Sequence, residues 1–375
     1  MAKRGSKKFR TEFRKNRSSR VRGSDLTRQF AKDELNHDKL ASAERLSGKG
    51  ELTRKRTIHG ATEGDDGELQ IDFDPSQCLQ GRVLRVRGLN SEVEVDGGQI
   101  YRCATRRLLK TLSTDQRHVV AAGDFVWIRP ADNQEGIIES IEARYGVLCR
   151  ASKRRQHVIV ANVDQLLIVA SAAEPYLKPN LIDRYLITAE KAGIKPIICI
   201  NKIDLVRPAD LQPLVGVYGQ MGYQVILLSA TEGIGVARLR AVVKDRASVL
   251  SGQSGVGKST ILNAIEPGLN LRVGHVSETT DKGRHTTTTA SLVPLEAGGH
   301  VVDTPGIRQF QLWDVIPEEV AGYFRDLRPF ITGCRFPDCS HTHEEGCGVK
   351  GAVADGFLDT RRYESYCQIH AGDMV

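Results

Sequence analysis

The residues with the clearest chemical meaning form a glycine-rich run, Gly252-Gln253-Ser254-Gly255-Val256-Gly257-Lys258-Ser259-Thr260. A short apolar run precedes it at 247–250, and a stretch of helical character follows at 261–265. Strand, glycine loop and helix are the context in which backbone N–H groups surround a phosphate at a helix N-terminus. Lys258 would reach the terminal phosphates of a nucleotide, and the Ser259 hydroxyl would bind Mg²⁺. The alternative is a glycine-rich turn with a chance Lys-Ser after it, which the flanking strand and helix disfavour.

A second polar group follows the apolar run 196–200 and consists of Asn201, Lys202, Ile203 and Asp204. Ligands of α/β sheets bind at the carboxyl ends of the strands, where this group would lie. Asp204 can accept hydrogen bonds from guanine N1–H and the exocyclic amine together, an edge that adenine does not offer. Lys202 can lie along the base plane, and Asn201 can tie the loop to the glycine-rich run. Such a site can reject the wrong base by roughly 10⁴-fold or more.

Two further short motifs would complete the contacts with the base and the phosphates. Ser229 and Ala230 follow the next strand and would supply a backbone N–H to guanine O6, although the dipeptide alone carries no specificity. Asp303-Thr304-Pro305-Gly306 follows an apolar strand, so Asp303 would hold Mg²⁺ through water and the Gly306 N–H would contact the γ-phosphate. A threonine of the pair 286–287 would complete the metal shell, and we assign Thr287 to it. A polar loop without such a role is the alternative for the threonines.

Three of the eight cysteines cluster near the C-terminus with two histidines. Cys334, Cys339 and Cys347, together with His341 or His343, make a Cys3His set, which is typical of a closed structural zinc site. The other five cysteines are scattered singly, and this usage favours a reducing compartment over a disulfide framework. Reduced cysteines without a metal are the alternative, which the density of ligand types disfavours.

The elements that must position these residues fall into four predicted segments. Residues 1–74 are polar and read as a largely disordered basic arm, with a transient helix near 26–43. Residues 75–144 contain about five short alternating strands, near 81–87, 92–95, 99–102, 125–128 and 136–141, which predict a small closed barrel of the OB type. Residues 145–312 alternate apolar strands with helices and predict a parallel α/β sheet covered on both faces. Residues 313–375 contain the cysteines and a predicted terminal helix at 351–369.

The net charge is unevenly distributed along the chain. Residues 1–22 hold ten Lys and Arg against one Glu, a charge of +9, whereas the whole chain is +7. Such a run is a solvated arm or an arm that grips phosphates; a transit peptide is disfavoured because the run lacks a clear apolar face. Outward arginines of the barrel suit a nucleic-acid backbone or a merely solvated face equally well. The chain has no run long enough to span a membrane and no signal-peptide core, so we expect a soluble, cytoplasmic protein.

The order of the motifs is unusual, because the guanine-reading loop and Ser-Ala precede the P-loop, the threonines and Asp-Thr-Pro-Gly. This is the usual GTPase series in circularly permuted order, which keeps the site intact if the old termini lie close together. With the barrel in front and the Cys3His set behind, the chain resembles the ribosome small-subunit-dependent GTPase A (RsgA) family over residues 78–370. The family's C-x4-C-x-H-x5-C pattern falls on Cys334, Cys339, His341 and Cys347, which favours His341 over His343. Its Gly-x-His-Thr-Thr switch falls on Gly283, His285, Thr286 and Thr287.

The resemblance implies a multidomain, circularly permuted P-loop GTPase with one structural zinc, and with Mg²⁺ bound together with GTP. It also implies a cytoplasmic factor that acts late in small-subunit assembly, touches rRNA and is stimulated by the small ribosomal subunit. We expect it to bind GTP and GDP, to have no membrane partner and to act as a monomer. The long basic arm is the main departure from the family's pattern.

The position after Asp-Thr-Pro-Gly is Ile307, where Ras-type GTPases place a glutamine that orients the attacking water. Isoleucine cannot do so, and slow intrinsic hydrolysis follows unless another group takes over. By chemistry and by resemblance that group is His285, which makes it the candidate catalytic residue; a structural histidine in a loop is the competing interpretation. A GTP-gated RNA-binding protein whose hydrolysis is incidental is the second function considered, and an ATP-dependent enzyme, disfavoured by Asp204, is the third.

Overall fold

The computed structural model describes the backbone of four short strands before residue 72 and most of the chain after it. The described residues are 9–13, 54–58, 61–63, 69–71, 73–106, 109, 119–152, 155–269, 290–303 and 315–372. The chain divides into two compact units, residues 1–74 and 75–375. In the first unit, β1 (Phe9–Phe13) pairs antiparallel with β2 (Arg54–Ile58), and β3 (Ala61–Glu63) pairs antiparallel with β4 (Leu69–Ile71). The predicted arm thus contains short strand pairs; its predicted helix at 26–43 lies outside the described residues.

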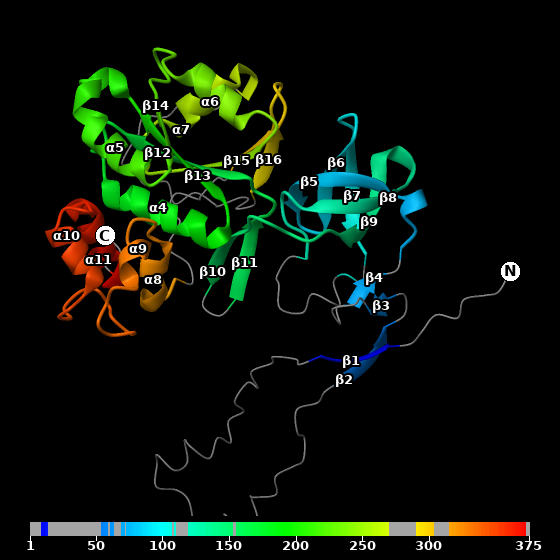
Figure 1. The fold of residues 1–375 in the computed structure, drawn as a ribbon. Helices are drawn as coiled ribbons and strands as arrows, with labels where there is room; N and C mark the ends of the chain where they lie inside the picture. Colours follow the sequence, from blue (N-terminus) through cyan, green and yellow to red (C-terminus); the bar gives the residue numbers. More distant parts are fainter. Residues whose placement is uncertain are drawn as a thin grey trace, which may run out of the picture. The chain divides into compact units, whose positions relative to one another are not determined.

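A closed five-stranded barrel opens the second unit (Figure 1). Its strands are β5 (Leu79–Arg87), β6 (Asn90–Val95), β7 (Ile100–Thr105), β8 (Phe125–Pro130) and β9 (Glu135–Ile141). The order is β5-β6-β7-β9-β8, and β8 returns to pair with β5, which closes the barrel. β7 and β9 are parallel while the other neighbours are antiparallel. Alternate residues such as Val83, Val93 and Ile138 are buried inside, as the period-two pattern predicts.

A six-stranded α/β sheet forms the central part of the unit, in the order β14-β13-β12-β15-β17-β16. Its strands are β12 (Gln165–Ser171), β13 (Lys195–Asn201), β14 (Gln224–Leu227), β15 (Ala247–Ser251), β16 (Ser291–Pro294) and β17 (His300–Asp303). All neighbours are parallel except β16, which runs antiparallel to β17. The near-continuous apolar runs of β12 and β13 follow from burial on both faces.

Helices cover both faces of this sheet (Figure 1). Helices α4 (Pro179–Ala192) and α5 (Gln212–Gln220) share one buried cluster with Ile168 and Ile198. Helices α6 (Val236–Val243) and α7 (Lys258–Ile265) share another with Leu167 and Ile197, the next residues along the same strands. α4 begins with Pro179 in its first turn and ends at Gly193, whose φ of 64° suits glycine.

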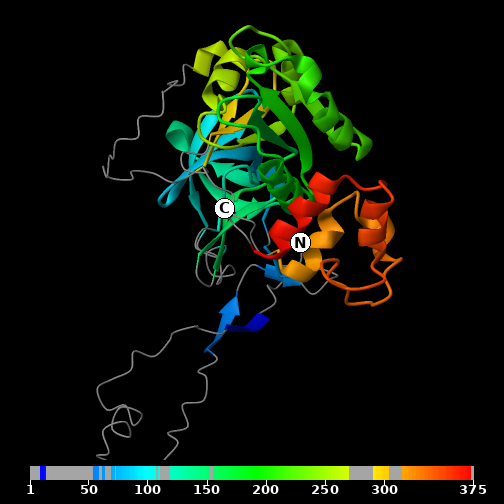
Figure 2. The same cartoon turned by 90° about the vertical axis from the view of Figure 1, so that its left-hand side faces the viewer.

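The C-terminal part is helical and packs on α4. It contains α8 (Pro317–Tyr323), α9 (Arg328–Ile331), α10 (Gly348–Ala354) and α11 (Thr360–His370), drawn from orange to red in Figure 2. Helices α8 and α11 contact α4. The single terminal helix predicted at 351–369 was wrong, because the chain turns at Gly356 (φ 77°) and a new helix starts where the Asp359 side chain accepts from the Arg361 N–H.

A two-stranded hairpin between barrel and sheet was not anticipated. β10 (Leu148–Ser152) pairs antiparallel with β11 (Arg155–Val160), and Leu148 and Val160 at its base are buried. Among the described residues, none of the helices combines the length and apolar character that crossing a bilayer requires.

Candidate nucleotide site and metal centre

The five parallel strands of the sheet end at one edge, and the described residues of the predicted nucleotide site lie at those ends. β13 ends at Asn201, β15 ends at Ser251 just before the glycine-rich run, and β17 ends at Asp303. Because parallel strands place their carboxyl ends on the same side, the fold brings segments 201–204, 229–230 and 252–260 together. Motifs that are far apart in the sequence therefore form one loop cluster.

The glycine-rich run has the backbone that a phosphate loop needs. Gly252, Gly255 and Gly257 have φ values of 153°, 82° and 93°, which side-chain-bearing residues rarely adopt. A Cβ on Gly252 would lie 2.1 Å from the Val169 carbonyl oxygen, so only glycine fits there. The Lys258 Nζ donates to the carbonyl oxygens of Gly252 (2.7 Å) and Gln253 (2.8 Å), which holds the ammonium over the start of its own loop. The lysine is thus hydrogen-bonded to the backbone of its own loop.

Asn201 connects the three loops of the site. Its Nδ2 donates to the Val256 carbonyl oxygen at 2.9 Å, and its Oδ1 accepts from the Ala230 N–H at 3.1 Å. A Cβ on Gly257 would lie 2.4 Å from the Asn201 Nδ2, so this glycine makes room for the asparagine as well as turning the loop. Asn201 is 2 % exposed, and its buried amide holds the loops at 201–204, 229–230 and 252–260 together.

Residues 201–204 turn sharply after the end of β13. Lys202 has a φ of 63°, Ile203 is buried, and Asp204 is exposed. The Lys202 Nζ donates to the Glu174 carbonyl oxygen, which also accepts from the Ser171 hydroxyl at 3.0 Å. Ser171 and Glu174 were not identified from the sequence. The available signal was their position at the end of β12, the strand that lies between β13 and β15.

Both backbone N–H groups of the Ser229–Ala230 pair have acceptors within the protein. The Ala230 N–H donates to the Asn201 Oδ1 at 3.1 Å and the Ser229 N–H donates to the Ile234 carbonyl oxygen at 3.0 Å, so a guanine O6 would share its donor with one of these acceptors. Ser229 is fully buried, and its hydroxyl lies 3.1 Å from the Thr231 hydroxyl and accepts from the Glu232 N–H at 3.3 Å. Its side chain shapes the turn that carries Ala230.

Two of the four predicted catalytic and magnesium residues, His285 and Thr287, lie outside the described residues, as do Thr286, Gly306 and Ile307. Asp303 is described as the last residue of β17, next to the phosphate-loop strand β15, which is where a water-mediated Mg²⁺ ligand belongs. Ser259 lies in the first turn of α7, directly behind the phosphate loop.

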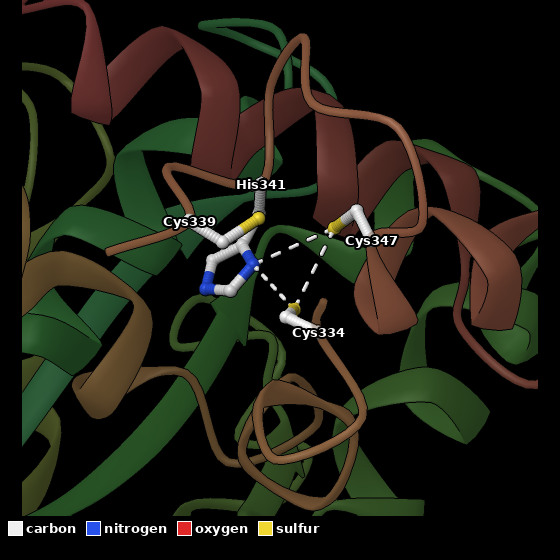
Figure 3. Close-up of side chains that lie close together, drawn as sticks. All are labelled: Cys334, Cys339, His341 and Cys347. Atoms are coloured by element: carbon white, nitrogen blue, oxygen red, sulfur yellow. Dashed lines mark hydrogen bonds between the residues drawn. The ribbon is translucent and has the colours of Figure 1, made fainter. Parts of the chain in front are cut away.

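The Cys3His residues converge on one point (Figure 3). The His341 Nδ1 lies 3.3 Å from the Cys334 Sγ and 3.5 Å from the Cys347 Sγ, and the two sulfurs are 3.9 Å apart. With the Cys339 sulfur, all four ligand atoms lie within 4.8 Å of one another. Tetrahedral zinc with bonds of about 2.0–2.3 Å requires ligand separations of about 3.3–3.8 Å. The two His341 distances fall within this range and the Cys334–Cys347 distance lies just above it, so the cluster could hold a zinc ion.

The surroundings favour His341 over His343 as the fourth ligand. Burial lowers the pKa of His341, which favours the neutral imidazole that metals bind. The His343 side chain is 83 % exposed and its Nδ1 lies 3.1 Å from the Thr342 hydroxyl. The structure thus brings His341, and not His343, to the three cysteines.

Side chains around the cluster fix the loop that carries its ligands. The Tyr363 and Tyr366 hydroxyls of α11 donate to the carbonyl oxygens of His341 (2.8 Å) and Ser340 (2.6 Å). The Glu344 carboxylate accepts from the Ser340 N–H, the Ser340 hydroxyl and the Thr342 N–H. These bonds lower the pKa of Glu344, the side-chain bond to Ser340 most, so it remains an acceptor. Partners of this kind orient metal ligands.

Comparisons with known proteins agree with this site and fold. A model of the RsgA GTPase family matches residues 141–313. The chain is 38 % identical over 316 residues to the small ribosomal subunit biogenesis GTPase RsgA of Sodalis glossinidius, covering 83 % of this chain and 88 % of that protein. It is 39 % identical over 351 residues to the RsgA of Ectopseudomonas mendocina, covering 91 % and 98 %.

Two solved structures are similar to this one. The crystal structure of YjeQ from Thermotoga maritima matches with a TM-score of 0.67 and 33 % identity, over 79 % of this chain and 98 % of that chain. YloQ, described as a circularly permuted GTPase, matches with a TM-score of 0.63 and 30 % identity, over 79 % and 94 %. The circularly permuted, multidomain architecture predicted from the motif order is thereby confirmed. Since the identities hold over most of each relative, the chain belongs to the RsgA GTPase family.

Proposed function

We propose that the chain hydrolyses GTP during late maturation of the small ribosomal subunit and is released after hydrolysis. The relatives are named as biogenesis GTPases of that subunit. The observation that carries the proposal is Asn201, whose amide bonds Val256 on one side and Ala230 on the other. Asn201 thus fixes the proposed base-binding loop relative to the proposed phosphate-binding loop. This arrangement suits a nucleotide, because its base and its phosphates then bind to loops held in one fixed geometry.

Each segment of the site has a proposed role. The N–H groups of residues 252–260 surround the phosphates, with Lys258 facing the terminal ones. Asp204 accepts from the guanine edge, and Ile203, buried beneath it, fixes the turn. Ser259, Thr287 and Asp303 would hold Mg²⁺, which supplies charge neutralisation at the β- and γ-phosphates when bound.

We assign hydrolysis to His285, which would position or polarise the attacking water because Ile307 cannot. Gly306 would bond the γ-phosphate and couple its presence to the switch. The second candidate is a GTP-gated RNA-binding factor whose hydrolysis is incidental, and the absent glutamine favours it. GTP turnover measured with and without small subunits separates the two candidates, because only the GTPase needs hydrolysis for its release from the subunit.

The remaining parts of the chain are proposed to bind the subunit. One zinc ion held by Cys334, Cys339, His341 and Cys347 would keep the C-terminal segment folded, as structural zinc does. The barrel and this segment would contact rRNA, and the basic residues 1–22 would add affinity without sequence preference. We propose a monomeric protein that acts in the cytoplasm, where its subunit partner is assembled.

The test is GTP turnover measured alone, with purified small subunits and with large subunits. We expect stimulation by small subunits only. Asp204→Asn should weaken GTP selectively, because one carboxylate makes both contacts with the base edge, whereas exposed Asp210→Asn nearby should not. Stimulation by large subunits as well, or an Asp204→Asn variant with unchanged GTP affinity and unchanged rejection of ATP, would contradict the assignment.

A further inference from the structure

The barrel is joined to the edge of the α/β sheet formed by β16 and β17, which we call the switch strands. Ser291 of β16 pairs with Arg85 of β5, so the barrel continues the sheet. A second contact joins the same parts of the chain, because the His300 Nε2 of β17 lies 3.0 Å from the Glu94 Oε2 of β6. Both contacts reach the two strands of the sheet nearest the barrel, and neither reaches the strands that hold the phosphate loop.

These two strands adjoin the two segments that we propose contact the γ-phosphate and Mg²⁺. β16 begins at Ser291, separated by one residue from the threonine-rich run 286–289, and β17 ends at Asp303, the first residue of Asp-Thr-Pro-Gly. β17 is only four residues long, so His300 and Asp303 are about 10 Å apart along an extended strand. A contact at the His300 end therefore acts on the position of Asp303 through one short, rigid element.

The Glu94–His300 contact is partly enclosed and chemically defined. The side chains are 22 % and 16 % exposed. Burial lowers the pKa of His300, so the neutral ring donates its Nε2–H to the carboxylate. Among the described residues, the buried His300 Nδ1 has no hydrogen-bond partner. Arg82 of β5 is the other charged group that acts on His300.

Further contacts join the barrel to the sheet beside this pair. The Arg82 guanidinium donates to the Asn162 carbonyl oxygen at 2.7 Å, close to the start of β12. Leu84 of β5 belongs to the same buried cluster as Leu292 of β16 and Val302 of β17. A displacement of the barrel would therefore be transmitted to β16 and β17 through these packed side chains.

We propose that Glu94 and His300 are positioning residues, through which the barrel sets β17 and thereby Asp303 when the protein docks on the small subunit. The inference builds on the proposed function, because it explains how binding outside the nucleotide site raises turnover. The competing explanation is a contact that only stabilises the fold. The two differ in which kinetic quantity changes, since a stabilising contact would leave the turnover of the folded fraction intact.

The experiment compares small-subunit-stimulated kcat, unstimulated kcat, KM for GTP and subunit affinity in four full-length variants. Glu94→Ala should lower stimulated kcat by roughly 5- to 150-fold, the range of typical coupling between sites, with the other quantities near wild type. Glu94→Gln and His300→Gln keep an acceptor and a donor and should restore most of the rate. Glu92→Ala removes the same charge from the same face of β6, where its partner is Arg87 of the barrel, and should have no effect.

Thermal unfolding of each variant separates a folding defect from a positioning defect, and Glu94→Gln tests the contact if Glu94→Ala is unstable. Equal stimulation of Glu94→Ala and wild type at equal subunit occupancy would overturn this inference alone. A parallel fall in stimulated and unstimulated kcat, or failure of both glutamine variants to restore the rate, would also overturn it. A wild-type protein that small subunits do not stimulate would overturn the proposed function, and this inference with it.

Discussion

Arg362 of α11 is the buried cation that fastens the C-terminal segment to α4. Its guanidinium meets the Asp183 carboxylate of α4 and donates to both oxygens of Asp326, at 2.9 and 3.0 Å. Its side chain is 4 % exposed and that of Asp183 is 1 % exposed. Burial alone would lower the pKa of Arg362, but Asp183 and Asp326 outweigh it, and the pKa is raised. Tyr218 of α5 donates to Asp183 at 2.8 Å, so three helices meet here.

Arg362→Met should loosen α11 from α4 by an amount that this geometry sets. The substitution leaves the Asp183 charge buried without its cation, which costs about 3–5 kcal/mol. A change of about 1.4 kcal/mol corresponds to a tenfold change in the opening equilibrium, so the amides of α11 should exchange with deuterium roughly 10²- to 10⁴-fold faster. Arg361→Met is the matched control, because the neighbouring Arg361 pairs with Asp359 at a surface site, its side chain being 48 % exposed. Such a pair is worth about 0–1 kcal/mol.

The assay is hydrogen exchange followed by mass spectrometry on peptides from α4 and α11. Asp183→Asn combined with Arg362→Met should recover part of the protection, because no uncompensated charge then remains in the interior. If Arg361→Met and Arg362→Met accelerate exchange in α11 equally, or if the double variant is worse than Arg362→Met, the buried charge is not what joins these helices.

Three other predictions concern histidines. His341→Ala should lose zinc, measured by elemental analysis of the purified protein, whereas His343→Ala should retain it; the reverse result would mean that the fourth ligand is misassigned. His285→Ala should lower subunit-stimulated kcat by roughly 10²- to 10⁴-fold with GTP affinity unchanged, and a normal stimulated rate would place the water-positioning group elsewhere, for example on the ribosome. Burial lowers the pKa of His300, so its contribution to stability is complete above the unfolded pKa of about 6.5 and is lost as the pH falls toward the lower folded pKa. The free energy of unfolding of His300→Gln should therefore decline less steeply than that of wild type below pH about 6.5, and equal slopes would refute the assignment.

The sequence predicted the parts of the site whose chemistry demands fixed residue types at short spacing. Phosphate loops need glycines at positive φ, and metal sites need thiolates and imidazoles close together, so residues 252–260 and the Cys3His set could be recognised locally. The strand positions of the barrel and the sheet followed from apolar periodicity. The order of the strands within the sheet was not predicted, because it depends on contacts between elements far apart in the sequence.

Contacts between distant elements could not be predicted in this way. Arg362 lies in the polar-looking run Thr-Arg-Arg-Tyr, and nothing local distinguishes it from exposed Arg361. Glu94 alternates with buried valines like any outward strand residue, so its partner on β17 depends on how two parts of the chain pack. The break in the terminal helix was missed because Gly356 was not weighed as a stop signal, although its φ of 77° makes it one.

The pairing of β16 with β5 also limits intermolecular strand pairing at this edge of the sheet. β16 would otherwise be the outermost strand of the α/β sheet, with a row of backbone donors and acceptors open to any extended segment. The barrel occupies that edge at Ser291, and Leu84 covers apolar neighbours beside it. Cutting the protein between barrel and sheet would thus uncover a template for strand addition, and the α/β part made alone should self-associate more than the full chain. The barrel therefore protects the β16 edge of the sheet from intermolecular strand addition.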